Sequence, residues 1–426
     1  MTRRVARGAA ALLPLLVLAA QLAAQGGVRP QSVPPPTPVP PNGSPSPFVS
    51  KLRTPADPTP VPAVDARATI LMDADTGQVL VERAPGVVQP VASLTKVMTA
   101  LLVLDAEEGR LDRRVRVHAD AVFDRGDFGS GSVLGLRAGE RVSVRGLLSG
   151  LLLGSANDAA EALAIEEAGS VGAFVDRMNA RARALGMSHT RFASPHGLDD
   201  RGRSSAADLM VLLRRVWSIP AFRDLVGRRS AVVRSSVARA RRIQNRNVLL
   251  WLYPGASGVK TGFTAGAGFC LLATARRGER SLAVVVLGGR DEVFSDAAAL
   301  LNHGFAAYEE APLIAEGESL GSAAVRGGDV PVVAGTALFG LVPVGTAATI
   351  DRHLTVSPNV AYPPPTGSTV GSLRLSLAGK TLGRIPVEVG RLEAPSPPAG
   401  SWWGRAASAV ASAVAGLVDD LMGSPA

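Results

Sequence analysis

The chain has 426 residues, of which 46% are apolar and 19% charged, so it can form large cores and is not disordered throughout. Its one cysteine, Cys270, excludes an intramolecular disulfide, and its five histidines lack metal-ligand spacing. The formal charge of +9 would suit nucleic acid, but aromatic residues make up only 4%, too few for a single-strand binder. We expect no metal, no cofactor and no nucleic-acid partner.

Residues 1–24 have the pattern of an export signal. Three arginines precede an apolar stretch from Ala9 to Ala24, and small residues at its end suit a cleavage site. An uncleaved membrane anchor has the same features. Both alternatives place the rest of the chain outside the cytoplasm.

Residues 25–65 are predicted to be a proline-rich, disordered linker. Thirteen of the 31 prolines lie between residues 30 and 62. Each proline removes a backbone donor and restricts φ, so no packed element is expected there. An extended tether fits this composition.

Residues 66–306 have the mixed pattern of an α/β or α+β domain. Apolar runs at 68–72 and 78–82, separated by Asp75-Thr76-Gly77, predict a β-hairpin with the glycine in its turn. Periodicity predicts these further elements: a helix starting near Ser93, helices at 144–153 and 159–167, strands at 270–273 and 282–287, and a closing helix at 296–305.

Residues 312–395 are predicted to be a small all-β domain. Leu373, Leu375 and Leu377 alternate with polar residues, which is typical of a half-buried strand. Glycine and proline recur densely around them, and about 80 residues are enough for one domain.

The last segment, residues 400–426, is predicted to be an amphipathic helix. Trp403, Val410 and Leu417 are among the residues on its apolar face. Such a helix can lie in the plane of a membrane, or it can pack on its own protein or a partner. A transmembrane helix is not favoured, because serines and Arg405 interrupt the stretch.

Lysine is rare: the chain has four lysines (Lys51, Lys96, Lys260 and Lys380) among its 45 basic residues. Lys96 closes the motif Ser93-Leu94-Thr95-Lys96, in which the serine and the lysine share one helix face. A buried lysine loses its proton more easily than an exposed one and can then accept the proton of a serine hydroxyl. Alone, this spacing is often coincidental.

Two further motifs follow. Ser155-Ala156-Asn157 offers a hydroxyl and an amide that can relay a proton and hold a lysine, although both residue types are also common helix caps. Lys260-Thr261-Gly262-Phe263-Thr264 offers a cation and hydroxyls for a carboxylate, or is a plain strand-end turn. The third motif is expected at a strand edge facing the cleft.

In this order, the three motifs are the signature of the penicillin-recognising serine enzymes. The chain resembles the D-alanyl-D-alanine carboxypeptidases among the low-molecular-mass penicillin-binding proteins over about residues 66–306. The segments that carry the resemblance are Ala92–Ala100, Ser155–Ala160, Pro195–Leu198, Asn245–Leu250 and Lys260–Thr264. It implies a β-lactamase/transpeptidase-like domain, with an antiparallel sheet flanked by helices, followed by the all-β domain.

The resemblance also implies roles for individual residues. Ser93 would be the acylated nucleophile, Lys96 its base, and Ser155 and Asn157 the proton shuttle. Lys260, Thr261 and Thr264 would hold the substrate carboxylate beside Gly262, and the amides of Ser93 and Phe263 would form the oxyanion hole. His196 would be structural. Arg290 stands nearest to the place of a carboxylate-binding arginine in the family, and Ala156 replaces a more frequent glycine.

The implied activity is removal of the terminal D-alanine from peptidoglycan stem peptides, with β-lactams as further ligands. A β-lactamase shares the three motifs, but the Glu-x-x-Leu-Asn pattern of a deacylating loop is absent. A His-dependent hydrolase and a P-loop enzyme are not favoured. A non-catalytic binder of cell wall or membrane remains an alternative, because residues 223–246 hold eight arginines and one acid.

Overall fold

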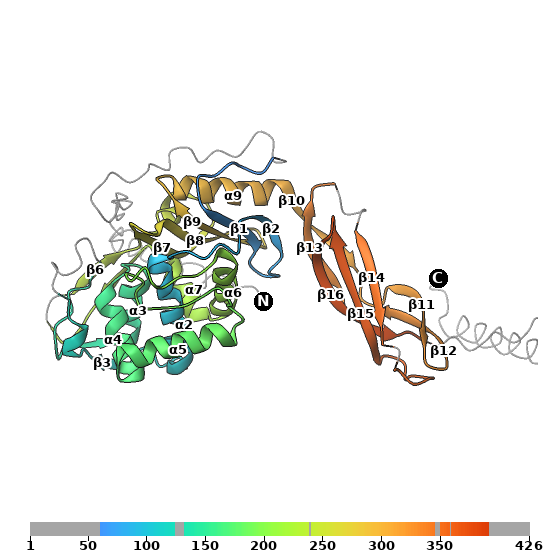
Figure 1. Ribbon diagram of the computed structural model, residues 1–426, viewed down its shortest axis with the longest axis horizontal. Coiled ribbons are helices and arrows are strands. Elements are labelled where there is room, and N and C mark those ends of the chain that lie inside the picture. The colour runs from blue at the N-terminus through green and yellow to red at the C-terminus, as the bar shows by residue number, and fades with distance from the viewer. Residues whose placement is uncertain (1–59, 124–131, 238–239, 346–349, 358, 392–426) are drawn as a thin grey trace, which may run out of the picture.

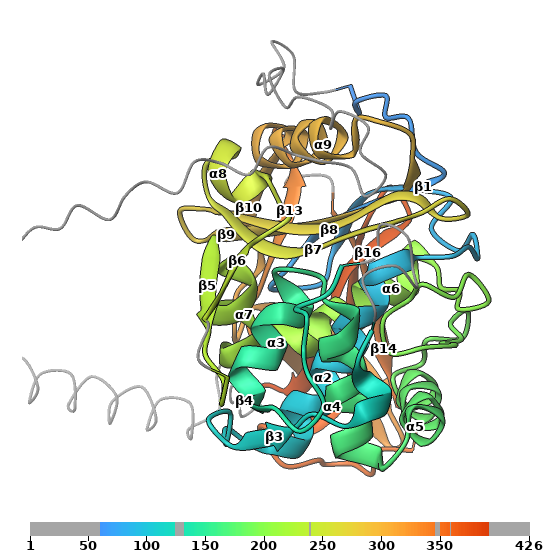
Figure 2. The same cartoon turned by 90° about the vertical axis from the view of Figure 1, so that its left-hand side faces the viewer.

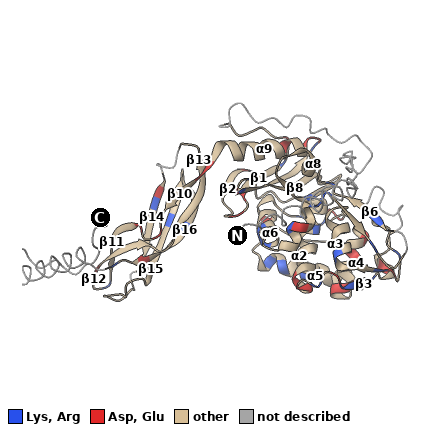
Figure 3. Cartoon of the chain, turned by 180° about the vertical axis from the view of Figure 1, so that it is seen from behind, with Lys and Arg blue, Asp and Glu red and all other residues tan. Residues whose placement is uncertain are grey.

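A computed structural model describes residues 60–123, 132–237, 240–345, 350–357 and 359–391. The predicted signal segment, most of the linker and the C-terminal helix lie outside these ranges. Figures 1 and 3 show, from opposite sides, a part built of helices and sheet beside a part built of strands alone. Within the described ranges, no helix is both long and apolar enough to cross a membrane.

The first part contains nine strands, seven α-helices of two turns or more, one short helix and two 3-10 turns, counted over the described residues. In chain order they are β1 (Ala68–Asp73), β2 (Val79–Arg83), η1 (Ala92–Thr95), α2 (Lys96–Glu107), β3 (Arg114–Arg116), η2 (Ala119–Ala121), β4 (Arg141–Ser143), α3 (Val144–Leu152), α4 (Asn157–Ala168), α5 (Val171–Ala184), α6 (Ala206–Trp217), α7 (Pro220–Gly227), β5 (Ser230–Val233), β6 (Arg241–Gln244), α8 (Leu249–Leu252), β7 (Ala256–Thr264), β8 (Gly268–Arg277), β9 (Arg280–Gly289) and α9 (Val293–Ala307).

The centre of this part is a five-stranded antiparallel sheet in the order β2-β1-β9-β8-β7. Strands β8 and β9 are buried along most of their length because a hydrophobic core covers each face of the sheet. Figure 2 shows α9 above the sheet and α2, α3 and α4 below it. The predicted fold of an antiparallel sheet flanked by helices is confirmed. Strand β7, which carries the third motif, lies at the sheet edge.

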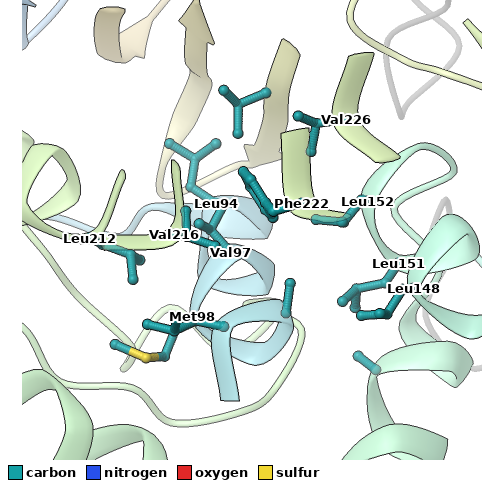
Figure 4. Packing of buried hydrophobic residues seen from close by; sticks show 14 of the residues in the cluster. Leu94, Val97, Met98, Leu148, Leu151, Leu152, Leu212, Val216, Phe222 and Val226 are labelled. Carbon is teal, nitrogen blue, oxygen red and sulfur yellow. The ribbon is translucent and has the colours of Figure 1, made fainter. Parts of the chain in front are cut away.

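Helix α2 is buried on nearly every side. Leu94, Val97 and Met98 are fully buried and pack with residues of α3, α6 and α7 (Figure 4). A helix enclosed in this way holds the side chains at its N-terminus in a fixed position. The predicted start near Ser93 corresponds to η1, whose 3-10 turn passes directly into α2.

The far ends of α2 and α4 are joined by a cluster of carboxylates around Arg113. Its guanidinium forms ion pairs with Glu107, Glu166 and Glu167. Burial, together with a hydrogen bond that the protonated Glu167 carboxyl donates to Glu107, raises the pKa of Glu167 from 4.5 to about 7. Since folding raises this pKa, the stability that the protonated carboxyl provides is present below pH 4.5 and is lost as the pH rises through about 7.

Replacement of Glu167 by glutamine is therefore expected to weaken the pH dependence of folding. Between about pH 5 and pH 8, the free energy of unfolding of the wild type should fall by about 1 kcal/mol more than that of Glu167→Gln. Urea titrations of both proteins at the two pH values measure this difference. Equal pH slopes for the two proteins would contradict the assignment.

The second part begins at Tyr308, four residues before the predicted Pro312, because α9 continues directly into β10. Its strands are β10 (Tyr308–Ile314), β11 (Ser319–Val325), β12 (Gly328–Ala334), β13 (Leu338–Pro343), β14 (Asp351–Val356), β15 (Thr369–Leu377) and β16 (Lys380–Val389). They form a five-stranded sheet in the order β11-β12-β16-β15-β14 and a ribbon of β10 with β13. As predicted, β15 alternates, with Leu373 and Leu375 buried in a separate core.

The two parts meet at β13. Leu341 of β13 belongs to the core of the first part, whereas its neighbour Val342 belongs to the core of the second. The side-chain amide of Gln78 donates to the carbonyl of Leu341 and accepts from its N–H. A shared strand and a paired amide therefore join the parts.

Candidate active site

The first motif lies where η1 becomes α2. Lys96 is fully buried, and its Nζ lies 2.8 Å from Ser93 Oγ and 2.6 Å from the backbone oxygen of His196. Burial, and then the positive charges of Lys260 and Arg246, hold the pKa of Lys96 well below 10.5. A larger fraction of Lys96 is thus neutral than for an exposed lysine. A neutral amine at this distance can accept the hydroxyl proton of Ser93.

The second and third motifs meet each other at the same site. Lys260 Nζ donates to Ser155 Oγ at 3.0 Å and to the backbone oxygen of Thr261 at 2.7 Å. Lys260 is 1% exposed, and burial followed by the charge of Arg246 lowers its pKa well below 10.5. Since Lys260 also lowers the pKa of Lys96, the two amines lie close enough to interact. All three motifs therefore converge.

The helix-cap interpretation of the second motif does not describe this structure. The N-cap residue of α4 is Ala156, and no side chain caps the helix. Ser155 is held at φ +60°, a left-handed conformation that costs a non-glycine residue about 1 kcal/mol. Asn157 is buried as the first residue of α4. The backbone thus presents Ser155 to Lys260 rather than to the helix.

Asp158 fixes the loop that faces this motif. Its carboxylate accepts hydrogen bonds from the backbone N–H groups of Leu134 and Leu136, at 2.8 and 3.0 Å. The N–H of Asn157 in turn donates to the backbone oxygen of Ser132 at 2.7 Å. Residues 132–136 are therefore held against the N-terminus of α4.

Close backbone contacts surround the serine of the first motif. Ala92 is also left-handed, at φ +47°. A Cβ atom on Gly262 would lie 3.0 Å from the Ser93 nitrogen, and one on Gly197 would lie 2.0 Å from the Ala92 oxygen. Both positions have glycine because a side chain would push β7 or the loop after His196 away from Ser93.

The imidazole of His196 has partners other than Lys96, the lysine that its backbone oxygen binds. Its Nε2 lies 3.3 Å from a carboxylate oxygen of Glu161, and its Nδ1 accepts from the N–H of Leu198 at 3.2 Å. Burial lowers the pKa of His196. Through its carbonyl, this residue positions Lys96, in agreement with the structural role that the resemblance implies.

Thr264 is less available than the resemblance implies. Its hydroxyl donates to Asp200 at 2.7 Å and accepts from the N–H of Ala267 at 3.0 Å, so its single proton is already engaged. The neighbouring Phe263 packs on Phe269, with ring centroids 4.6 Å apart. Among the hydroxyls of the third motif, that of Thr261 is the better placed to donate to a ligand.

Arg290, which the sequence suggests as a carboxylate ligand, lies at the surface, and a different arginine, Arg246, acts on the site. Arg290 is more than four-fifths exposed and lies 3.6 Å from Asp65. Arg246, which has no role assigned from the sequence, acts on both Lys96 and Lys260 through its charge. Its neighbour Asn247 donates to the backbone oxygen of Gly258 in β7 at 2.8 Å. Arg246 lies within Asn245–Leu250, one of the segments that carry the family resemblance, and this position could have identified it as a candidate site residue from the sequence.

The motifs that other enzyme classes use lie far along the chain from this site. A Gly-x-Ser-x-Gly pattern does occur at Gly317–Gly321, but Ser319 is exposed at the start of β11 and a strand follows it instead of a helix. In Gly379-Lys380-Thr381, the glycine lies in the turn after β15 and the other two residues begin β16, so a strand follows the turn instead of a helix. Neither pattern has the strand–helix setting that its chemistry needs.

Comparison with known proteins supports one family. A family model for D-alanyl-D-alanine carboxypeptidases, peptidase family S11, matches residues 54–291. The D-alanyl-D-alanine carboxypeptidase DacC of Escherichia coli is 36% identical over 343 residues, which cover 77% of this chain and 84% of that protein. Penicillin binding protein 5 of Haemophilus influenzae is 28% identical, with a TM-score of 0.65, over 78% of this chain and 98% of that structure. A Streptomyces K15 DD-transpeptidase variant is 32% identical, with a TM-score of 0.53, over 57% and 99%.

Proposed function

The chain belongs to the D-alanyl-D-alanine carboxypeptidase family, and on that premise we propose that Ser93 is the nucleophile of its reaction. The protein is a serine peptidase of peptidoglycan metabolism and has the penicillin-binding fold. It removes the terminal D-alanine of stem peptides, and β-lactams are further ligands. The relatives act on the cell wall, outside the cytoplasm.

In the proposed acylation, Ser93 Oγ attacks the carbonyl carbon of the scissile D-Ala-D-Ala bond. Lys96 accepts the hydroxyl proton, and the amides of Ser93 and Phe263 stabilise the oxyanion. The C–N bond then breaks, and a proton passed through Ser155 converts the leaving nitrogen to the amine of D-alanine. Water later hydrolyses the ester and regenerates the Ser93 hydroxyl.

Substrate orientation is proposed to depend on the cationic side of the site. Lys260, Thr261 and Arg246 supply charge and a hydroxyl for the terminal carboxylate. Asn157 is proposed to orient Lys96, and Gly262 lets β7 pass close to Ser93. The hydroxyl of Thr264 donates to Asp200. It would therefore bind the substrate carboxylate only if that hydrogen bond were broken first.

One observation carries this proposal: the separation of 2.8 Å between Lys96 Nζ and Ser93 Oγ, with the lysine fully buried. A non-catalytic binder would not need a desolvated amine beside a half-buried hydroxyl. A β-lactamase shares this pair, yet no deacylating glutamate loop is expected from the sequence. The similarity to a DD-transpeptidase leaves transfer of the acyl group to an amine as the second candidate reaction.

The remaining segments are assigned by proposal. Residues 1–24 would direct export, residues 25–65 would act as a tether, and residues 400–426 would contact the membrane surface. The boundaries proposed from the sequence for the two folded parts are 66–306 and 312–395, and the start of β10 at Tyr308 moves the beginning of the second part four residues earlier. These assignments place the site between the cell membrane and the wall polymer.

Labelling with a fluorescent penicillin tests the proposed nucleophile. The purified chain should form a stable adduct, and peptide mass spectrometry should place the added mass on Ser93. Deacylation should be slow, because no base is assigned to activate water. An adduct on another residue, or no adduct in a folded sample, would overturn the assignment.

A further inference from the structure

The hairpin of β5 and β6 presents two different faces. Along β6 and the two residues after it, exposure alternates: Arg242 and Arg246 are exposed, whereas Ile243 and Asn245 are buried. Side chains of a strand point alternately to its two sides, so Arg242 and Gln244 share the outward side; Arg246, in the bend just after the strand, is exposed as well.

The inward side anchors this hairpin to the site. Arg241 pairs with the buried Glu140 and donates to the backbone oxygen of Leu134, in the loop that Asp158 holds. The side-chain amide of Asn245 donates to the backbone oxygens of Val226 and Arg228, at 3.1 and 3.0 Å. The outward side chains therefore project from a fixed support.

The partner strand extends the same face. Val232 lies opposite Arg242 and is 45% exposed, and Arg234, two residues further on, is exposed as well. Arg234 thus lies diagonally across from Arg242 on the same face of the hairpin. Arg234, Arg242 and Arg246 together are named the basic strip here. Figure 2 shows the hairpin beside α7 and α3, and Figure 3 shows basic residues on β6.

No carboxylate neutralises the basic strip among the residues that the structure describes. None of its three arginines takes part in the ion pairs there, and the nearby Glu140 is turned inward to Arg241. Its inner end is Arg246, whose backbone N–H donates to the oxygen of Leu153, two residues before Ser155, at 3.2 Å, and whose charge acts on both active-site lysines. The strip therefore begins at the site and leads away from it.

We propose that the basic strip is an extended subsite for an acidic acyl chain, the part of the stem peptide ahead of the scissile bond. The inference rests on the proposed function and deepens it. Arg246 would act at the terminal carboxylate, whereas Arg242 and Arg234 would attract carboxylates further along the peptide. Such exposed charges act over several ångströms and weaken with salt.

Two synthetic peptides that both end in D-Ala-D-Ala test this subsite. One contains a γ-linked D-glutamyl residue with a free α-carboxylate, and the other contains the same residue as its carboxamide. At low salt, Arg242→Gln should lower kcat/KM about threefold for the carboxylate peptide, through KM, and leave the carboxamide peptide unchanged. The double variant with Arg234→Gln should lose about tenfold, and added salt should abolish the difference.

Arg374→Gln is the matched control, since it removes an exposed arginine from β15 of the other part and should change neither peptide. Equal losses on both peptides, or no loss on either, would overturn the proposal. So would binding to anionic phosphatidylglycerol vesicles that depends on Arg242 while the peptide kinetics stay unchanged. Penicillin labelling distinguishes failure of this subsite from failure of the proposed function. If only the subsite is wrong, the wild type is still labelled on Ser93; if the proposed function is wrong, this labelling is absent.

Discussion

Replacement of Lys96 by arginine or methionine is expected to slow acylation of Ser93 by about a thousandfold. Arginine stays protonated and cannot accept the hydroxyl proton, and methionine has no basic atom. Lysine serves here because burial and the charges of Lys260 and Arg246 lower its pKa. Methionine also removes the cost of a buried charge, so its variant should keep the fold.

The rate of labelling by a fluorescent penicillin measures this effect, alongside thermal unfolding of each variant. Thr99→Val is the matched control: Thr99 donates to the backbone oxygen of Pro195 at 2.6 Å, one residue before the carbonyl that Lys96 contacts. It should lose about 1 to 2 kcal/mol of stability and keep acylation. A folded Lys96→Met protein that acylates within tenfold of the wild-type rate would refute the role of the base.

Replacement of Gly197 by alanine is expected to destabilise the protein by more than about 3 kcal/mol. Gly197 has φ +79°, and an added Cβ would lie 2.0 Å from the Ala92 oxygen and 2.7 Å from Thr95 Oγ1. Relief of these contacts would move the loop whose carbonyl at His196 binds Lys96. Acylation should therefore fall together with stability.

Gly186→Ala provides the comparison for this change. Gly186 has φ +77°, almost the same backbone conformation, but no atom lies within 4 Å of its added Cβ. Its variant should lose only about 1 kcal/mol, the cost of a left-handed alanine. Urea unfolding measures the loss in free energy of unfolding for both variants, and the difference between the two losses is the cost of the close contact with Ala92 beyond backbone strain. Losses of equal size would show that this contact is unimportant.

Much of this site follows from local sequence. The spacing of Ser93 and Lys96 places both on one face of a helical turn, whatever surrounds them. The apolar runs at 270–273 and 282–287 predict the strands β8 and β9, and the alternation of Leu373 and Leu375 predicts a half-buried strand. These features depend on residues a few positions apart, so periodicity and spacing are enough to predict them.

Other features depended on which distant segments pack together. The backbone oxygen of His196, 100 residues from Lys96, is a partner that no side-chain pattern encodes. The bond between Thr264 and Asp200 withdraws a hydroxyl that the motif alone would assign to substrate. Sequence alone determined the chemical groups and their order, because a motif is local. Tertiary structure decided their neighbours, and desolvation and nearby charge set what a buried lysine can do.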